Sequence, residues 1–114
     1  MTPAQWDVVV VPFPFTDGPG NKRRPAVVIS PGDFNQEAGH SVLVMITSAG
    51  HSTWPGDLAL DHKRLGLHKP CMLRMKFFTL DNRLIERLIT TLPVDGQLHI
   101  RRFLARFCNA AMDG

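Results

Sequence analysis

Four consecutive valines near the start of the chain constrain its fold more than any other feature. The run Val8–Val11 is followed by Pro12 and Pro14. β-Branched side chains favour extended backbone, and proline cannot donate a hydrogen bond to a sheet. The pattern therefore predicts a strand over residues 7–12 that ends at a sheet edge or leads into a loop. Residues 16–21, Thr-Asp-Gly-Pro-Gly-Asn, predict that exposed loop.

Similar short apolar runs, separated by segments rich in proline and glycine, continue along the chain. Residues 25–30 contain the second run, Ala-Val-Val-Ile. Residues 41–47 carry apolar side chains on both faces, which predicts a buried central strand. A second long loop is expected at residues 49–56. Weaker patterns predict three further strands, at residues 58–61, 71–77 and 86–92.

The last quarter of the chain has helical periodicity. Beyond Pro93, apolar side chains recur at Ile100, Phe103, Leu104 and Phe107, with arginines between them at Arg101, Arg102 and Arg106. This predicts an amphipathic helix whose arginines face solvent. One helical turn, capped by Thr79 or Asp81, is expected within residues 79–85. The predicted fold class is mainly β with a C-terminal α-helix, forming a small, strongly bent β-barrel with its function in the loops.

Composition and charge narrow the class of protein. A chain of 114 residues, 44% hydrophobic and 20% charged, is expected to form one globular domain over residues 1–114. It has no apolar run of membrane-spanning length and no export signal, so a cytoplasmic protein is expected. Cys71 and Cys108 lie outside any CxxC spacing, which predicts two buried hydrophobic residues rather than a zinc site or disulfide. A net charge of +3 fits a polyanionic partner without proving one.

A basic cluster and two hydroxyl residues form the candidate site. Lys22, Arg23 and Arg24 precede Pro25, and Thr47-Ser48 ends the central strand. If the second and third strands pair antiparallel, Arg24 and Thr47 meet at one rim of the sheet. Pro25 favours extended backbone at Arg24, whose guanidinium is suited to binding two phosphate oxygens. The alternative is a solvated charge run beside an ordinary strand end.

Two segments resemble the N-terminal signature of the MazF/PemK toxins of type II toxin-antitoxin systems. They are residues 7–17, Asp-Val-Val-Val-Val-Pro-Phe-Pro-Phe-Thr-Asp, and residues 22–30, Lys-Arg-Arg-Pro-Ala-Val-Val-Ile-Ser. Residues 78–81 and 84–87 extend the resemblance over nearly the whole chain. It implies an SH3-like barrel, a symmetric homodimer and a cognate antitoxin that lays an acidic, apolar segment across the basic groove. It also implies a metal-independent, cofactor-free endoribonuclease that cuts single-stranded RNA, including mRNA, by attack of the ribose 2′-hydroxyl.

The resemblance assigns roles to two residues and leaves the general base open. The family's catalytic, phosphate-binding arginine before proline corresponds to Arg24, and its threonine at the end of the third strand corresponds to Thr47. Some relatives have a carboxylate where this chain has Lys76, and others a glutamate in the first loop, where Asp17 is the one acid left. Asp17 is therefore the candidate catalytic base. The alternative is that Asp17 only caps a turn. Catalysis then relies mainly on positioning and electrostatics, or the enzyme is less active than its relatives. Trp6 replaces a glycine common among relatives and is expected to affect packing only.

The remaining candidates are RNA-binding residues: Lys22, Arg23, Ser48, His51, Trp54, Arg74 and Lys76. Trp54 is expected either to stack on a base or to fasten its loop to the barrel. Arg74 resembles a family residue of the RNA groove, and the alternative is a rim charge on a strand.

Other function classes remain open. A degenerate toxin or a non-catalytic binder of the same fold, such as a CcdB-like gyrase poison, is the alternative. CcdB-like chains end in Trp-Gly-Ile, whereas this chain ends in Ala-Met-Asp-Gly, which disfavours the gyrase poison. A metal-dependent nuclease is disfavoured because the sequence has no cluster of acids or histidines at ligand spacing.

Overall fold

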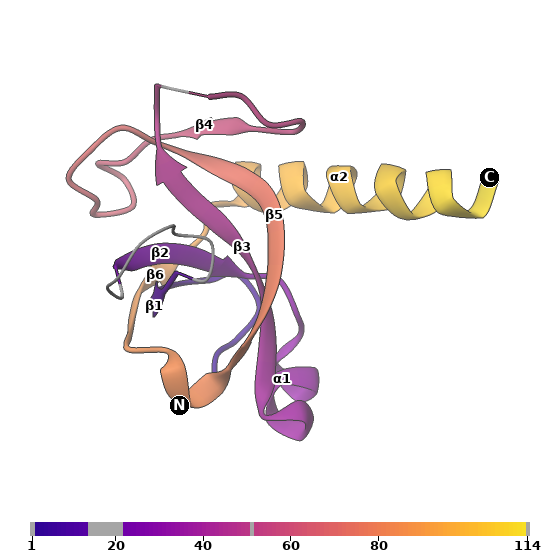
Figure 1. The fold of residues 1–114 in the computed structure, drawn as a ribbon, viewed down its shortest axis with the longest axis horizontal. Coiled ribbons are helices and arrows are strands. Elements are labelled where there is room, and N and C mark those ends of the chain that lie inside the picture. Colours follow the sequence, from indigo (N-terminus) through magenta and orange to yellow (C-terminus); the bar gives the residue numbers. More distant parts are fainter. Residues whose placement is uncertain (1, 14–21, 51, 114) are drawn as a thin grey trace.

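The described strands form one curled, antiparallel sheet. The computed structural model describes residues 2–13, 22–50 and 52–113, with side chains up to residue 109. The sheet has the order β4-β5-β3-β2-β1-β6 and curls into a half-barrel (Figure 1). Its strands are β1 (Asp7–Pro12), β2 (Arg23–Val28), β3 (His40–Ser48), β4 (Leu58–Leu60), β5 (Cys71–Asp81) and β6 (Arg87–Thr91).

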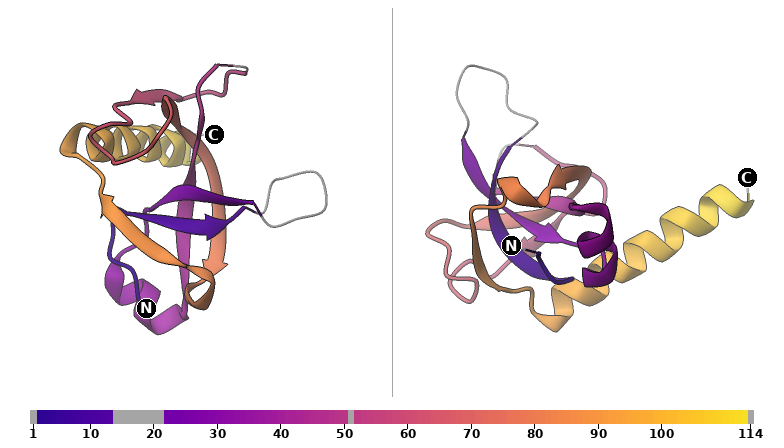
Figure 2. Two further views of the ribbon diagram at one scale, coloured as in Figure 1. Left: turned by 90° about the vertical axis from the view of Figure 1, so that its left-hand side faces the viewer. Right: turned by 90° about the horizontal axis from the view of Figure 1, so that it is seen from below.

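Within the described residues, three helical elements accompany the sheet. The first, α1 (Gly32–Ala38), connects β2 to β3, and the 3-10 turn η1 (Asn82–Leu84) connects β5 to β6. The last, α2 (Val94–Asp113), packs across one face of the sheet, and its C-terminal half extends beyond the barrel (Figure 2). The predicted class, mainly β with a C-terminal helix, is confirmed. No helix in the described ranges is long and apolar enough to cross a lipid bilayer.

Both faces of the central strands are buried, and the described residues form an apolar cluster on each face. On the α2 side, Val44 and Ile46 of β3 pack with Ile100 of the helix. On the other side, Leu43 and Met45 pack with the aromatic and aliphatic side chains inside the curl. Strand side chains alternate between faces, so a strand apolar on both faces must lie between two layers. The central, buried position predicted for β3 is confirmed.

The start of β2 and the end of β5 differ from the sequence-based prediction. Strand β2 begins at Arg23, two residues early, so Arg23 and Arg24 belong to the strand. Strand β5 continues to Asp81, and the helical turn after it is capped by Asp81, whose side chain accepts a hydrogen bond from the backbone of Arg83 at 2.9 Å. Of the two predicted caps, Asp81 is therefore confirmed, and Thr79 lies inside the strand.

Helix α1 was not predicted, because its stability comes from distant contacts. The fully buried Asn35 donates hydrogen bonds to the carbonyls of Pro3 at 3.0 Å and Ser30 at 3.1 Å. The prediction of two buried cysteines is half right: Cys71 is buried, but Cys108 is exposed. Cys108 lies near the C-terminal end of α2, with its side chain exposed to solvent.

Trp6 adopts a backbone conformation that favours glycine. Its φ is 75°, in the left-handed region, and it is the one non-glycine residue with positive φ in the described ranges. Its amide donates to the Val28 carbonyl at 2.7 Å, and its carbonyl accepts from the Leu92 amide at 2.8 Å. These bonds connect the chain to β2 and β6 and hold the turn into β1. The expectation that Trp6 affects packing only was therefore incomplete, because the position also imposes backbone strain.

Candidate nucleic-acid interface

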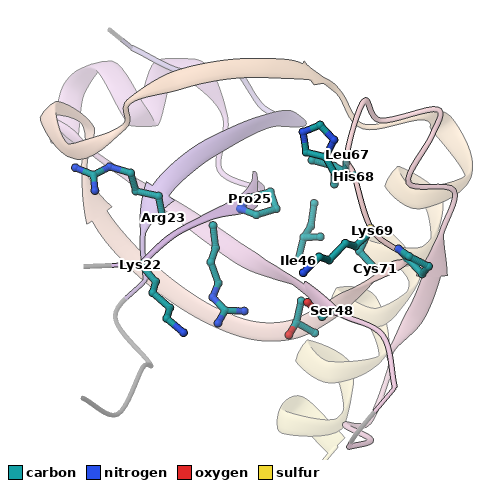
Figure 3. Close-up of a pocket in the computed structure, with 12 residues that line it drawn as sticks. Lys22, Arg23, Pro25, Ile46, Ser48, Leu67, His68, Lys69 and Cys71 are labelled. Atoms are coloured by element: carbon teal, nitrogen blue, oxygen red, sulfur yellow. The ribbon is translucent and has the colours of Figure 1, made fainter. Parts of the chain in front are cut away.

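A basic pocket lies where β2 begins, β3 ends and β5 begins. Antiparallel pairing of Ala26 with Met45 sets the start of β2 beside the end of β3, and Ser48 pairs with Cys71 on the other side. The pocket has a volume of about 510 Å³ (Figure 3). Its lining residues are Lys22, Arg23, Arg24, Pro25, Ile46, Thr47, Ser48, Leu67, His68, Lys69, Pro70 and Cys71.

Arg24 is half-buried in this pocket and held by an aromatic ring. Its guanidinium carbon lies 5.4 Å from the centroid of the Phe13 ring, a cation–π contact. Phe13 itself packs edge-to-face on Phe78, with centroids 6.2 Å apart, and its amide donates to the Lys22 carbonyl at 3.1 Å. The aromatic pair therefore limits the directions in which Arg24 can point. Sequence reasoning missed Phe13, although the aromatic residue after Pro12 was a signal.

Arg23 points away from the pocket centre (Figure 3), as expected for the neighbour of Arg24 on a strand. Its guanidinium forms an exposed ion pair with Glu86, and the hydrogen bond that Arg23 donates to that carboxylate raises the pKa of Arg23. Arg23 thus belongs to the rim of the pocket, and the Glu86 carboxylate offsets part of its positive charge.

Thr47 and Ser48 supply hydroxyl groups at the end of β3. Both line the same pocket as Arg24, so the structure brings together the residues that the strand arrangement predicted at one rim. Beneath them the pocket surface is apolar, formed by Pro25, Ile46, Leu67, Pro70 and Cys71. Burial raises the pKa of the Cys71 thiol, which favours its neutral form.

The opposite wall comes from the loop before β5, which sequence reasoning passed over. His68 and Lys69 line the pocket from this loop, and Figure 3 shows Lys69 extending into it. The only signal in the sequence was a basic pair immediately before Pro70 and β5. Among the described residues, the pocket is lined by lysines, arginines and a histidine but by no carboxylate, so it is suited to a polyanion.

Arg74 does not line this pocket, and its guanidinium is hydrogen-bonded to other side chains and a backbone carbonyl. Its side chain donates to both carboxylate oxygens of Asp57, at 2.9 and 3.2 Å, and to the hydroxyl and carbonyl oxygens of Ser52, both at 3.0 Å. Only 9% of Arg74 is exposed. The hydrogen bond from Arg74 is the largest of the effects that hold the pKa of Asp57 below its usual value. Arg74 thus fastens the loop before β4 to β5 and does not line the pocket that contains Arg24.

Trp54 and Lys76 meet on a different surface from Arg24. The Lys76 ammonium lies 4.6 Å from the Trp54 ring centroid, and the indole N–H donates to the Met75 carbonyl at 3.2 Å. Trp54 thus fastens its loop to β5 while remaining 41% exposed. Both residues line a hollow beside Phe77, Phe103 and Phe107. The structure therefore does not bring Trp54 or Lys76 to the Arg24 pocket.

Two candidates, Asp17 and His51, lie outside the described residues. Within the described ranges, no group of three or more His, Cys, Asp or Glu side chains is arranged to hold a metal ion.

Comparisons with known proteins agree with this architecture. The family described as PemK-like, MazF-like toxin of type II toxin-antitoxin system matches residues 4–108. Comparison with curated proteins gives no match. The fold is similar to that in a MazE-MazF structure (Form III) from Deinococcus radiodurans, with 26% identity, a TM-score of 0.76 and coverage of 96% of this chain and 98% of that chain.

Two more distant likenesses concern the fold alone. MazF (Form I) from Deinococcus radiodurans has 24% identity and a TM-score of 0.75, with coverage of 96% of this chain and 98% of that chain. An endoribonuclease in complex with its cognate antitoxin, from a mycobacterial species, has 14% identity and a TM-score of 0.68. The match covers 92% of this chain and 91% of that chain.

Proposed function

Because the chain belongs to the PemK-like, MazF-like toxins of type II toxin-antitoxin systems, we propose that it is an endoribonuclease that cuts single-stranded RNA without a metal ion. The observation that carries the proposal is the pocket lined by Arg24, Thr47 and Ser48, to which the described residues contribute no carboxylate. A guanidinium and neighbouring hydroxyls are the donors that a phosphodiester requires.

The reaction we propose is an internal transfer within the RNA. The ribose 2′-oxygen attacks the adjacent phosphorus as its proton leaves, and the bond from phosphorus to the 5′-oxygen breaks. The leaving oxygen takes up a proton, so the products are a 2′,3′-cyclic phosphate and a 5′-hydroxyl. Negative charge accumulates on the non-bridging phosphate oxygens in the transition state, and fixed donors aimed at those oxygens lower the barrier.

Arg24 is the residue we assign to that charge. Its guanidinium donates two parallel N–H groups to non-bridging oxygens, and the contact with Phe13 reduces the entropy lost on aligning it. Thr47 adds a neutral donor from the end of β3. Asp17 is the candidate for accepting the 2′-hydroxyl proton, and catalysis by positioning and electrostatics alone is the alternative.

Two partners complete the proposal. The first is a cognate antitoxin whose acidic, apolar segment covers the basic pocket and excludes RNA. The second is another copy of this chain. Phe107 is 61% exposed and stacks on Phe103 at 5.8 Å between ring centroids. Phe77 joins them, at 6.1 Å from Phe103. Phe77 and Phe103 are half-buried, so Phe107 is the exposed end of an aromatic cluster that continues into the core. An exposed aromatic side chain backed in this way is typical of a protein interface, and we assign it to the homodimer.

The test uses a long, unstructured RNA and the purified protein in excess chelator. Discrete cuts ending in cyclic phosphate are expected, and they should disappear in a folded Arg24→Ala variant. A non-catalytic binder of this fold, including a gyrase poison, predicts intact RNA. Intact RNA with both proteins would therefore contradict the nuclease proposal.

A further inference from the structure

We propose that Lys69 and the apolar floor beside it form a subsite for the nucleotide next to the cleaved bond. Lys69 binds that nucleotide's phosphate, and the floor receives its base. The inference rests on the proposed ribonuclease function and assigns a second phosphate contact to the same pocket.

The sheet order places two cations on opposite sides of the end of β3. Arg24 comes from β2 on one side of β3, and Lys69 immediately precedes Pro70 and β5 on the other. Figure 3 shows Lys69 extending from its loop into the pocket. A chain with a phosphate at every nucleotide can therefore contact both cations while crossing the end of β3.

Lys69 differs from the arginines that form ion pairs in having no carboxylate partner within the described ranges. By contrast, the described ion pairs engage four arginines, namely Arg23 with Glu86, Arg64 with Asp95, Arg74 with Asp57 and Arg83 with Asp81. The exposed ammonium of Lys69 needs no rearrangement of an internal ion pair to meet a phosphate.

The backbone that carries Lys69 is fixed on both sides. On one side, Leu65 is 2% exposed in the core, and the Leu67 amide donates to the His62 carbonyl at 2.8 Å. On the other, the Pro70 carbonyl accepts from the Ala49 amide at 3.1 Å, directly after β3. These anchors preorganise the position of Lys69 relative to the end of β3, which reduces the entropy cost of binding.

The floor between the cations is suited to a base rather than to another phosphate. Leu67 and Pro70 come from the same loop as Lys69, and Ile46 and Pro25 complete the apolar surface. A nucleobase has flat apolar faces, which such a surface shields from water. The pocket thus combines a cationic rim for the backbone with an apolar floor for a base.

The test compares Lys69→Met with Lys63→Met, a matched control. Lys63 is an exposed lysine in the same loop that does not line the pocket. The probe is a single-stranded RNA whose cut site has been mapped, carrying a 2′-O-methyl group there so that it binds without being cut. Dissociation constants are measured over a range of salt concentrations. Each phosphate contact on a single strand contributes about 0.7 to the slope of log affinity against log salt.

We expect Lys69→Met to weaken binding about tenfold at low salt and to lower the slope by about 0.7, with Lys63→Met unchanged. Lys69→Arg should retain the wild-type slope. With cleavable RNA, Lys69→Met should raise KM and leave kcat nearly unchanged.

Two results would overturn the assignment of Lys69 but leave the ribonuclease proposal intact. One is equal binding by the Lys69→Met and Lys63→Met variants, and the other is a loss confined to kcat, which would move Lys69 to the cleaved phosphate itself. Failure of the folded wild-type protein to bind the RNA would instead overturn the ribonuclease proposal on which the assignment rests.

Discussion

Replacing Asp57 by Asn removes the charge that Arg74 faces, while keeping the shape of the side chain. The pair is largely shielded from water, since the side chains of Arg74 and Asp57 are 11% and 14% exposed. The Asp57 carboxylate also accepts a hydrogen bond from the Trp54 amide at 3.0 Å. Loss of one member of a buried ion pair typically costs about 3–5 kcal/mol, and the residual exposure points to the lower end, about 3 kcal/mol.

Chemical denaturation of Asp57→Asn and Arg74→Met, with the double variant, measures this pair directly. The double-variant cycle separates the coupling between Arg74 and Asp57 from the other effects of each substitution. We expect each single variant to lose about 3 kcal/mol and the double variant to lose less than the sum. A loss below about 1 kcal/mol in each would refute the role of this pair, because that is the range of an exposed pair.

The same pair predicts a pH dependence of stability. Arg74 lowers the pKa of Asp57 in the folded protein, so the stabilisation is present above the ordinary carboxyl pKa of about 3.9. It is lost as the pH falls from there through the lowered pKa. Asp57→Asn should therefore lose stability less steeply than the wild type below about pH 4. Equal slopes in the two proteins would contradict this account.

Five further predictions concern the site, the backbone at Trp6 and the interface. Arg24→Ala should lower the cleavage rate about 10²–10³-fold at unchanged melting temperature, and Thr47→Val should lower it less; both are measured in single-turnover cleavage. Asp17→Asn should remove the acidic limb of the pH-rate profile if Asp17 is the base. Trp6→Gly should be more stable than Trp6→Ala by about 1 kcal/mol in denaturation, since glycine relieves the positive φ of 75°. Phe107→Lys should shift the mass in light scattering from dimer to monomer.

Each of these has an outcome that contradicts it. Near-normal cleavage by folded Arg24→Ala would show that Arg24 has no catalytic role. Full activity of Thr47→Val would show that the Thr47 hydroxyl is not needed for cleavage. An unaltered pH-rate profile in Asp17→Asn would contradict the role of Asp17 as the base and would support the alternative in which it only caps a turn. Greater stability of Trp6→Ala than of Trp6→Gly would contradict the strain argument. A monomeric wild-type protein at micromolar concentration would contradict the homodimer.

Local sequence patterns were sufficient to predict the strands and the C-terminal helix. The valine run of β1 and the two-faced apolar pattern of β3 depend on neighbours within a few residues, and proline and glycine mark their limits. The shared pocket of Arg24 and Thr47 was predictable as well. Antiparallel pairing of adjacent strands sets the start of one beside the end of the next.

Tertiary structure alone decided which cations are available to a ligand. Arg74 and Lys69 are both basic residues near the start of β5, yet the first is bound by Asp57 and Ser52 and the second lines the pocket. Their difference depends on where the loops before β4 and β5 fold, which local patterns do not specify. Whether a charge is neutralised or exposed is determined by the groups that folding brings around it, often from distant parts of the chain.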